Sequence, residues 1–323
     1  MPPRITHHMR YHVPMQNESP IPLVAIVGPT AVGKTALSLA LAAALGGEIV
    51  SADSRQVYRQ LNIGTAKPTP VERAAVPHHL IDIAEPDEDF SLARYQDLAS
   101  AAIGTIAARG RLPILVGGTG QYLVALLEGW QIPRVAPQPE LRAQLEAEAA
   151  SRGTAVLHAR LASIDPAAAA GVPPTNLRRI IRALEVYEVT GEPISTQQTK
   201  RPPPYHSRAL WLTLPADALY QRIDARVDAM IAAGLLDEVR GLLARGYTWH
   251  LPAMSSLGYR EFEPYFAGVA TLAACVERLK FNTHAFARRQ PAWFRRLPHV
   301  AQLAADAPDL VEQALGLVHP LHS

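Results

Sequence analysis

The sequence has little cysteine and no long hydrophobic run. Cys275 is the one cysteine among 323 residues, which excludes a disulfide framework and any zinc site built from cysteines. A single cysteine suits a reducing cytoplasm, where the protein is expected to act. No stretch of about 18 apolar residues is present, so neither a transmembrane helix nor a membrane partner is predicted. The H-E-x-x-H motif of metalloproteases and the G-x-S-x-G motif of serine hydrolases are also missing.

Neither sign of charge dominates the composition. There are 31 Lys and Arg residues against 29 Asp and Glu residues, so the net charge identifies no class of partner and the distribution of charge has to be examined instead. Hydrophobic residues make up 48% and charged residues 19%, which excludes global disorder, collagen-like repeats and a long coiled coil. Residues 1–20 are polar and lack the apolar core of a signal peptide, so they are expected to form a disordered extension.

Apolar runs and amphipathic segments alternate along residues 21–132. The expected buried strands are 23–27, 48–51, 79–83 and 112–116, and the expected helices are 35–45 and 91–109. This alternation is typical of an α/β fold in which a parallel sheet is flanked by helices. Residues 206–323 return to the pattern, with a predicted strand at 210–214 and helices at 216–233, 235–244 and 271–288.

The segment 133–205 interrupts this pattern. Prolines separate amphipathic helical pieces, of which 140–152 and 176–190 are the clearest, and no strand is predicted. We therefore expect an all-helical insertion domain between two halves of the core, 21–132 and 206–323.

A phosphate loop follows the first predicted strand and opens a helix. Its sequence GPTAVGKT matches G-x-x-x-x-G-K-[ST] in full. In such a loop successive N–H groups and the positive end of the helix face one anion. A lysine adds positive charge, and the following hydroxyl is suited to ligating Mg²⁺. The loop predicts a diphosphate or triphosphate ligand, held by Gly28, Pro29, Thr30, Ala31, Val32, Gly33, Lys34 and Thr35.

Two further segments come directly after predicted strands, where ligands bind in parallel sheets. Asp53 follows the second strand and is a candidate general base or an indirect partner of Mg²⁺, and the alternative is a turn-forming or helix-capping aspartate. The glycine-rich turn 117–120 follows the strand 112–116 and offers the Thr119 hydroxyl to a substrate. A plain strand-to-helix turn is the alternative there.

Basic residues gather in two segments. Arg178 and Arg182 lie four residues apart on one face of a predicted helix. Residues 278–296 contain six Lys or Arg residues, no acidic residue and several aromatic residues. Basic and aromatic residues together are typical of RNA contact, whereas a solvated helix face with aromatic core residues is the alternative.

Arg222 and Arg226 form another pair with a spacing of four residues. They are placed either to reach the phosphates of the ligand or to pair with the neighbouring Asp224 and Asp228. The sequence leaves both arrangements open.

Several motifs together resemble those of tRNA dimethylallyltransferases, also called tRNA isopentenyltransferases. The resemblance extends from Leu23 to about Arg296. The matching segments are GPTAVGKT (28–35), DSRQVY (53–58), IGTAKP (63–68), HHLIDI (78–83), VGGTGQY (116–122), RRIIRALEVY (178–187), LYQRIDARVDAMI (219–231), SSLGYRE (255–261) and ARRQPAWFRR (287–296). With one cysteine, the chain resembles the bacterial type without a zinc finger.

The resemblance implies a P-loop NTPase-like core and a helical insertion that grips the tRNA anticodon stem-loop. The implied reaction moves a dimethylallyl group from dimethylallyl diphosphate to N6 of the adenosine 3′-adjacent to the anticodon, with Mg²⁺ as cofactor. Asp53 would be the general base, and Thr30 and Lys34 of the phosphate loop would be the other catalytic residues. Arg226 would contact the diphosphate.

The resemblance also implies a set of tRNA contacts at six places along the chain. These are Asp53, Ser54, Arg55, Gln56, Thr119, Arg142, Arg178, Arg179, Ile180, Ile181, Arg182, Ser255, Ser256, Leu257, Gly258, Tyr259, Arg260, Arg288, Arg289, Gln290, Trp293 and Arg295.

Two other functions fit part of the sequence. A small-molecule kinase would use the same loop on ATP, but it leaves the basic and aromatic segment 278–296 unexplained. An RNA-binding protein with a nucleotide switch would need no chemistry at Asp53. No acidic residue follows the strand 112–116, where ATPases often hold Mg²⁺, and this favours the transferase. A monomer is expected.

Overall fold

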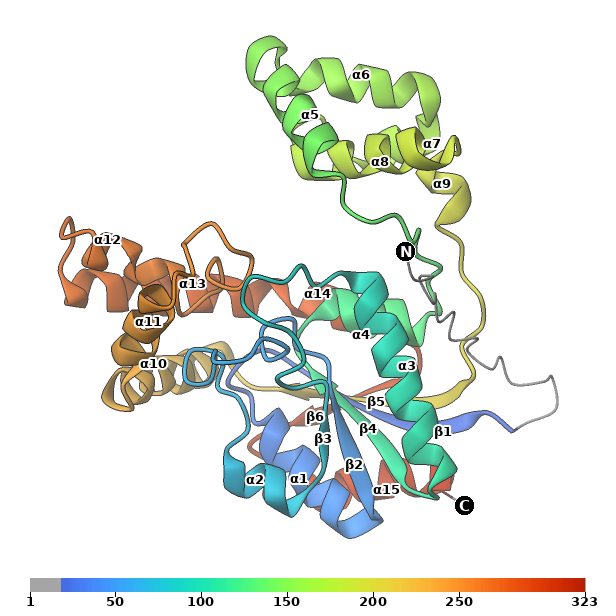
Figure 1. Cartoon of the computed structure of the whole chain (residues 1–323). Helices are drawn as coiled ribbons and strands as arrows, with labels where there is room; N and C mark the ends of the chain where they lie inside the picture. The colour runs from blue at the N-terminus through green and yellow to red at the C-terminus, as the bar shows by residue number, and fades with distance from the viewer. Residues whose placement is uncertain (1–18, 323) are drawn as a thin grey trace, which may run out of the picture.

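The computed structural model describes residues 19–322 (Figure 1). The disordered extension expected at 1–20 lies, apart from residues 19 and 20, outside the described residues. No helix of the described part is both long and apolar enough to cross a membrane.

A parallel sheet of six strands forms the centre of the described chain, in the order β3-β2-β4-β1-β5-β6. The strands are β1 (Ile21–Val27), β2 (Gly47–Ser51), β3 (His78–His79), β4 (Leu112–Gly117), β5 (Tyr205–Thr213) and β6 (Val300–Ala304). β1 lies between β4 and β5, and its residues 23–27 are fully buried because helices cover both faces. The α/β class predicted from the sequence is confirmed.

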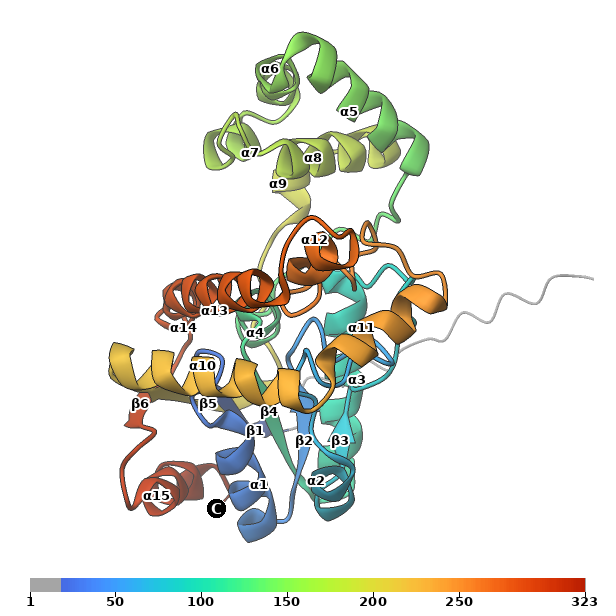
Figure 2. The same cartoon turned by 90° about the vertical axis from the view of Figure 1, so that its left-hand side faces the viewer.

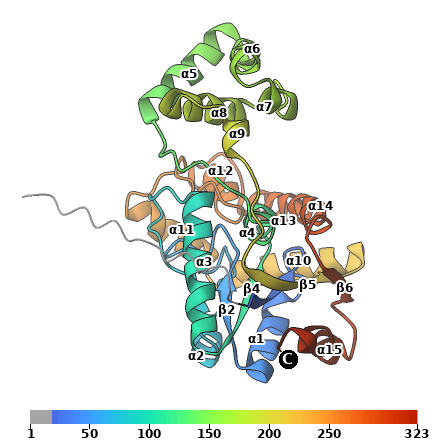
Figure 3. The same ribbon diagram turned by 90° about the vertical axis from the view of Figure 1, so that its right-hand side faces the viewer.

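Helices pack on both faces of the sheet (Figure 3). One face carries α3 (Leu92–Ala108) and α4 (Gly120–Leu127), which bury residues such as Ile103 and Leu123 against the strands. The other face carries α1 (Lys34–Leu45) and α15 (Leu310–His322). Ser91 accepts a hydrogen bond from the N–H of Arg94 and so caps α3 as its sequence predicts.

A third apolar cluster lies beside the sheet (Figure 2). It is built from α10 (Ala216–Ala232), α11 (Leu235–Ala244) and α13 (Leu272–Arg289), together with the chain segments around residues 57–63 and 253–262. The short elements η1 (Arg260–Phe262) and α12 (Glu263–Phe266) complete this part of the chain, whereas α2 (Pro70–Ala75) lies near α1 and α14 (Pro291–Phe294) buries Phe294 in the cluster of α3 and α4 (Figure 1). The cluster holds α10 and α13 close to the loops that follow the strands.

Helices α5 (Pro139–Arg152), α6 (Thr154–Ile164), α7 (Pro166–Gly171), α8 (Leu177–Thr190) and α9 (Ile194–Gln197) stand apart from the sheet (Figure 1). They bury their own apolar cluster, which includes Leu157, Leu161 and Leu184. The two connecting segments run side by side, because Gln131 N–H donates to Thr199 O at 2.8 Å and Arg201 N–H donates to Gly129 O at 2.9 Å.

The structure differs from the sequence prediction in three strands. The strand expected at 79–83 ends after His79, because Leu80 and Asp82 have positive φ angles of 64° and 57°. β5 begins at Tyr205, five residues before the predicted start at Leu210. The prediction missed this start because the first residues of the strand are mostly polar and break the apolar run. β6, an edge strand with one buried residue, and the terminal helix α15 were not predicted.

Candidate active site at the ends of three adjacent strands

The phosphate loop joins β1 to α1 and closes around the side chain of its own lysine. Gly33, with a φ angle of 111°, precedes the first turn of α1. The Lys34 ammonium donates to Gly28 O at 3.0 Å and to Pro29 O at 2.8 Å. Burial and the nearby Arg226 lower the pKa of Lys34 to about 7, against the opposing effect of Asp53. An anionic ligand beside the Lys34 ammonium would raise this pKa again and so favour the charged form of the side chain.

Asp53 lies at the end of β2, in the turn that leads away from the sheet. Its Oδ1 accepts the N–H of Arg55 at 2.8 Å and the N–H of Gln56 at 3.3 Å. Within the described chain no hydrogen bond reaches its Oδ2. The turn-forming role left open by the sequence is therefore real, but it occupies one oxygen and leaves the other available to accept a proton.

The turn after β4 supports the Asp53 turn. The N–H of Ser54 donates to the Thr119 hydroxyl oxygen at 3.0 Å, and the N–H of Thr119 donates to Ala52 O at 3.2 Å. Thr119 thus fixes the backbone next to Asp53 and lies at the same edge of the sheet. The glycine-rich turn is more than a connection between strand and helix.

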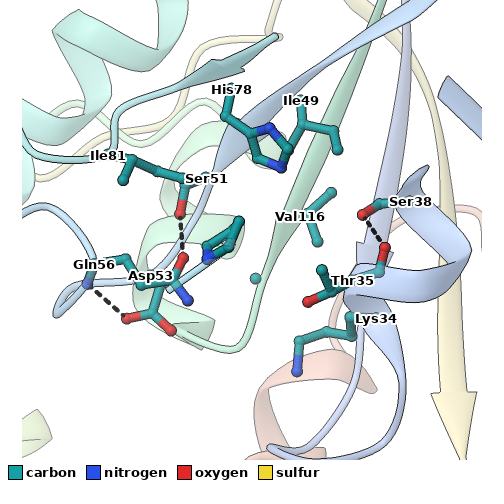
Figure 4. A pocket seen from close by; sticks show the side chains of 12 residues that line it. Lys34, Thr35, Ser38, Ile49, Ser51, Asp53, Gln56, His78, Ile81 and Val116 are labelled. Atoms are coloured by element: carbon teal, nitrogen blue, oxygen red, sulfur yellow. Dashed lines mark hydrogen bonds between the residues drawn. The ribbon is translucent and has the colours of Figure 1, made fainter. Parts of the chain in front are cut away.

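A pocket separates the phosphate loop from Asp53 (Figure 4). Lys34 and Thr35 lie on one side of this pocket, and Asp53 lies on the other. Apolar side chains make up much of the remaining wall. These are Ile49, Pro68, Ile81 and Val116. The pocket therefore joins an anion site, a carboxylate and an apolar surface that suits a hydrocarbon group.

Two arginines of α10 face the phosphate loop. Burial lowers the pKa of Arg226, and the negative charge of Asp53 counteracts this effect. Arg222 donates to Val32 O at 3.4 Å. Asp224 and Asp228, the alternative partners, are bound instead by His284 and Lys280 of α13, each at 2.8 Å. In the described chain these arginines therefore do not pair with Asp224 or Asp228, and they lie beside the phosphate loop.

The insertion helices divide the predicted RNA contacts into exposed and buried residues. Arg178 and Arg179 are exposed, whereas the side chains of Ile180 and Ile181 lie in the apolar core and cannot contact RNA there. This corrects the expectation for the two isoleucines.

Glu185 binds the other two predicted contacts of the insertion. Arg142 donates to its two carboxylate oxygens at 2.7 and 2.9 Å, and Arg182 donates to Oε2 at 2.6 Å. Burial would raise the pKa of Glu185, but these arginines and the N–H of Gln138 lower it to about 2. Arg142 and Arg182 therefore stabilise the insertion, a role that sequence analysis missed although Glu185 stands three residues after Arg182.

The segment 255–260 is divided in the same way. Ser255 and Arg260 are exposed and Leu257 is partly exposed, whereas Ser256, Gly258 and Tyr259 are buried. The Tyr259 hydroxyl donates to Glu238 Oε1 at 2.6 Å, and its ring packs against Gly64. Tyr259 thus connects α11 to the segment 62–64, Gly258 lies against Gly64, and the Ser256 hydroxyl donates to Ala253 O. The three buried residues are not placed to contact RNA through their side chains.

The end of α13 and the following α14 combine exposed cations with buried anchors. Arg288, Arg289 and Arg295 are exposed. Trp293 packs against Gly120 at the start of α4, where a Cβ atom would come within 2.3 Å of the indole side chain. Gln290 is only 4% exposed. Arg55 and Gln56 are likewise engaged within the protein, with Pro252 O at 2.6 Å and with Thr65 O at 3.2 Å.

The fold and the site together define an α/β enzyme with a phosphate loop that faces a carboxylate across a partly apolar pocket. The IPP transferase family model matches residues 56–297, and the isopentenyl transferase model matches residues 21–82. The chain belongs to the IPP transferase family.

Relatives and solved structures agree with this family. The tRNA dimethylallyltransferase of Roseiflexus sp. (strain RS-1) is 72% identical over 298 residues, which cover 92% of this chain and 98% of the relative. The tRNA dimethylallyltransferase of Chloroflexus aurantiacus (strain ATCC 29366) is 65% identical, over 88% of this chain and 97% of the relative. The crystal structure of the full-length tRNA isopentenylpyrophosphate transferase from Bacillus halodurans is 42% identical, with a TM-score of 0.68 over 93% and 97% of the two chains. A eukaryotic dimethylallyltransferase, described in crystallographic snapshots as acting on tRNA, is 29% identical, with a TM-score of 0.80 over 91% of this chain and 78% of that chain.

Proposed function

We propose that the protein is a tRNA dimethylallyltransferase. It transfers a dimethylallyl group from dimethylallyl diphosphate to N6 of the adenosine 3′-adjacent to the anticodon and releases diphosphate. The observation that carries this proposal is the pocket that places the phosphate loop opposite Asp53, with apolar side chains between them. The names of the relatives support tRNA prenylation rather than a small-molecule kinase.

Asp53 acts as the general base in this reaction. The N6 amine is a poor nucleophile because its lone pair is delocalised into the adenine ring. As the bond from N6 to C1 of the dimethylallyl group forms and the C1–O bond to diphosphate breaks, Asp53 accepts the proton that N6 loses. Its free Oδ2 is the acceptor. The adenosine has to leave the stack of the anticodon loop to enter the pocket.

The leaving diphosphate is stabilised by the cations around the phosphate loop. Lys34 and Arg226 supply two positive charges, and the loop N–H groups and the start of α1 add to them. The Thr35 hydroxyl, which lines the pocket at the first turn of α1, would hold Mg²⁺ together with diphosphate oxygens, because Mg²⁺ needs few protein ligands when a phosphate is present. When bound, Mg²⁺ neutralises charge that develops on the leaving group.

The exposed arginines bind the anticodon stem-loop through its phosphates. They are Arg178, Arg179, Arg260, Arg288, Arg289 and Arg295. The protein acts as a monomer in the cytoplasm, where unmodified tRNA is available.

One assay tests this function against its alternative. Unmodified tRNA, Mg²⁺ and dimethylallyl diphosphate are incubated with the protein, and the tRNA is examined by mass spectrometry for the gain of one dimethylallyl group. Phosphate release from ATP is measured in parallel. We expect modified tRNA without consumption of ATP, and ATP turnover without modified tRNA would favour the kinase instead. Asp53→Asn is the matched control, because it keeps the shape of the side chain and removes its basicity.

A further inference from the structure

Gln290 connects two loops of the candidate site through a single buried amide. Its Oε1 accepts the N–H of Thr30 in the phosphate loop at 3.0 Å, and its Nε2 donates to Gly118 O in the turn after β4 at 2.8 Å. The two loops follow adjacent strands, whereas Gln290 lies 260 residues after Thr30, immediately beyond α13. Because only 4% of the residue is exposed, both hydrogen bonds are shielded from water.

The Pro29–Thr30 peptide is held at both ends. Its N–H donates to Gln290, and its C=O accepts from the Lys34 ammonium at 2.8 Å. An anion in the loop would draw Lys34 away from that carbonyl, which leaves the peptide with Gln290 and with the longer bond from the Val32 N–H to Pro29 O, at 3.4 Å. The Thr30 N–H is therefore committed to Gln290 and is not among the groups that point at the anion.

The turn after β4 is shaped to receive this amide. A Cβ atom on Gly118 would lie 2.5 Å from Gln290 Nε2, and the next nearest atom would be 3.7 Å away. The neighbouring Thr119 accepts the N–H of Ser54 and so fixes the Asp53 turn. The phosphate loop is thus connected to the backbone beside Asp53 by the two hydrogen bonds of Gln290, the Gly118–Thr119 peptide and the hydrogen bond from Ser54 to Thr119.

We propose that Gln290 is a positioning residue that sets the phosphate loop in register with the Asp53 turn. The proposal rests on the proposed function, because it takes the loop as the site of the donor diphosphate. A carboxamide meets the requirement of one acceptor and one donor, whereas glutamate supplies only acceptors and methionine supplies neither. Gln290 does not bind tRNA, in contrast to the exposed Arg289 beside it.

The first test uses Gln290→Met, which keeps the approximate volume and removes both hydrogen bonds. Inorganic diphosphate is titrated in the absence of tRNA, and amide hydrogen exchange is measured over residues 28–35. We expect diphosphate affinity to fall by about tenfold or more and loop exchange to accelerate, while tRNA affinity stays within about twofold of wild type. Arg289→Ala should give the opposite result, with weaker tRNA binding and unchanged diphosphate affinity.

The second test is a double-mutant cycle with Gly118→Ala. The added methyl group displaces the Gln290 amide, so Gly118→Ala alone should weaken diphosphate binding about as much as Gln290→Ala. The double variant should be no weaker than Gln290→Ala, because the clash then has no partner. Additive losses, or Gln290→Met with normal loop exchange, normal diphosphate affinity and weakened tRNA binding, would overturn the proposal. Prenyl transfer by the wild type is scored separately, so a failure of the proposed reaction is distinguished from a failure of the role of Gln290.

Discussion

Donor binding should depend on pH through Lys34. In the free protein, burial and Arg226 lower the pKa of Lys34 to about 7. A bound diphosphate raises that pKa again, so binding is accompanied by proton uptake and its affinity falls as the pH rises above 7. If Lys34 is fully protonated in the complex, uptake is about 0.9 proton at pH 8, and the dissociation constant rises by about tenfold for each further pH unit.

Isothermal titration of inorganic diphosphate between pH 7 and 9, in buffers of different ionisation enthalpy, measures both quantities. Lys34→Arg is the matched control, because a guanidinium stays protonated throughout this range and should abolish the slope that Lys34 contributes. An affinity that is constant from pH 7 to 9 in the wild type, or a slope that Lys34→Arg leaves unchanged, would refute the reasoning.

Three further results are expected. Asp53→Asn should lower the single-turnover rate of prenyl transfer by about 100-fold or more while donor and tRNA affinities stay near wild type; a rate within a few-fold would remove Asp53 as the base. Reversing Arg288 and Arg289 to Glu should flatten the dependence of tRNA affinity on salt, as measured by filter binding, because fewer counterions are released; an unchanged slope would assign them to a solvated helix face. Glu185→Gln should destabilise the insertion by about 1–2 kcal/mol at pH 7, after allowance for screening of its half-exposed arginines, and the difference from wild type should vanish as the pH falls from about 4.5 towards 2. Urea unfolding across this pH range measures it, and a difference that is independent of pH would contradict this role for the carboxylate.

The sequence could predict the elements that obey a strong local rule. The phosphate loop, the strands β1 and β4 and the capped helix α3 follow from apolar runs, glycine stops and a serine N-cap. β6 could not be predicted in this way, because an edge strand with one buried residue has little periodicity, and it is stabilised by pairing with β5, which is distant in sequence. Non-local contacts of this kind leave no local pattern.

The site residues that directly follow strands could be predicted from the sequence. The site residues that distant helices bring to the sheet could be predicted much less well. Parallel strands place their carboxyl ends together, so the meeting of Lys34, Asp53 and Thr119 follows from topology. The buried contacts of Gln290 and Tyr259 depend instead on how α13 and α11 pack beside the sheet. Sequence position alone could not separate these buried residues from their exposed neighbours.

Buried glutamates explain why the basic motifs contain residues that stabilise the fold in addition to residues that are exposed for RNA contact. Glu185 and Glu261 each lie within such a motif, and a buried carboxylate is stable only when its oxygens are hydrogen-bonded. Each therefore binds nearby donors, as Glu185 binds Arg142 and Arg182, and those donors are committed to the fold. Exposed arginines that contact no buried glutamate, such as Arg178 and Arg179, are free of this requirement, whereas Arg260 is exposed and still binds Glu261 Oε1 at 3.3 Å. Within one motif, substitution of an exposed arginine that contacts no buried glutamate should therefore change tRNA affinity without changing the unfolding midpoint, whereas substitution of a partner of a buried glutamate should lower the midpoint itself.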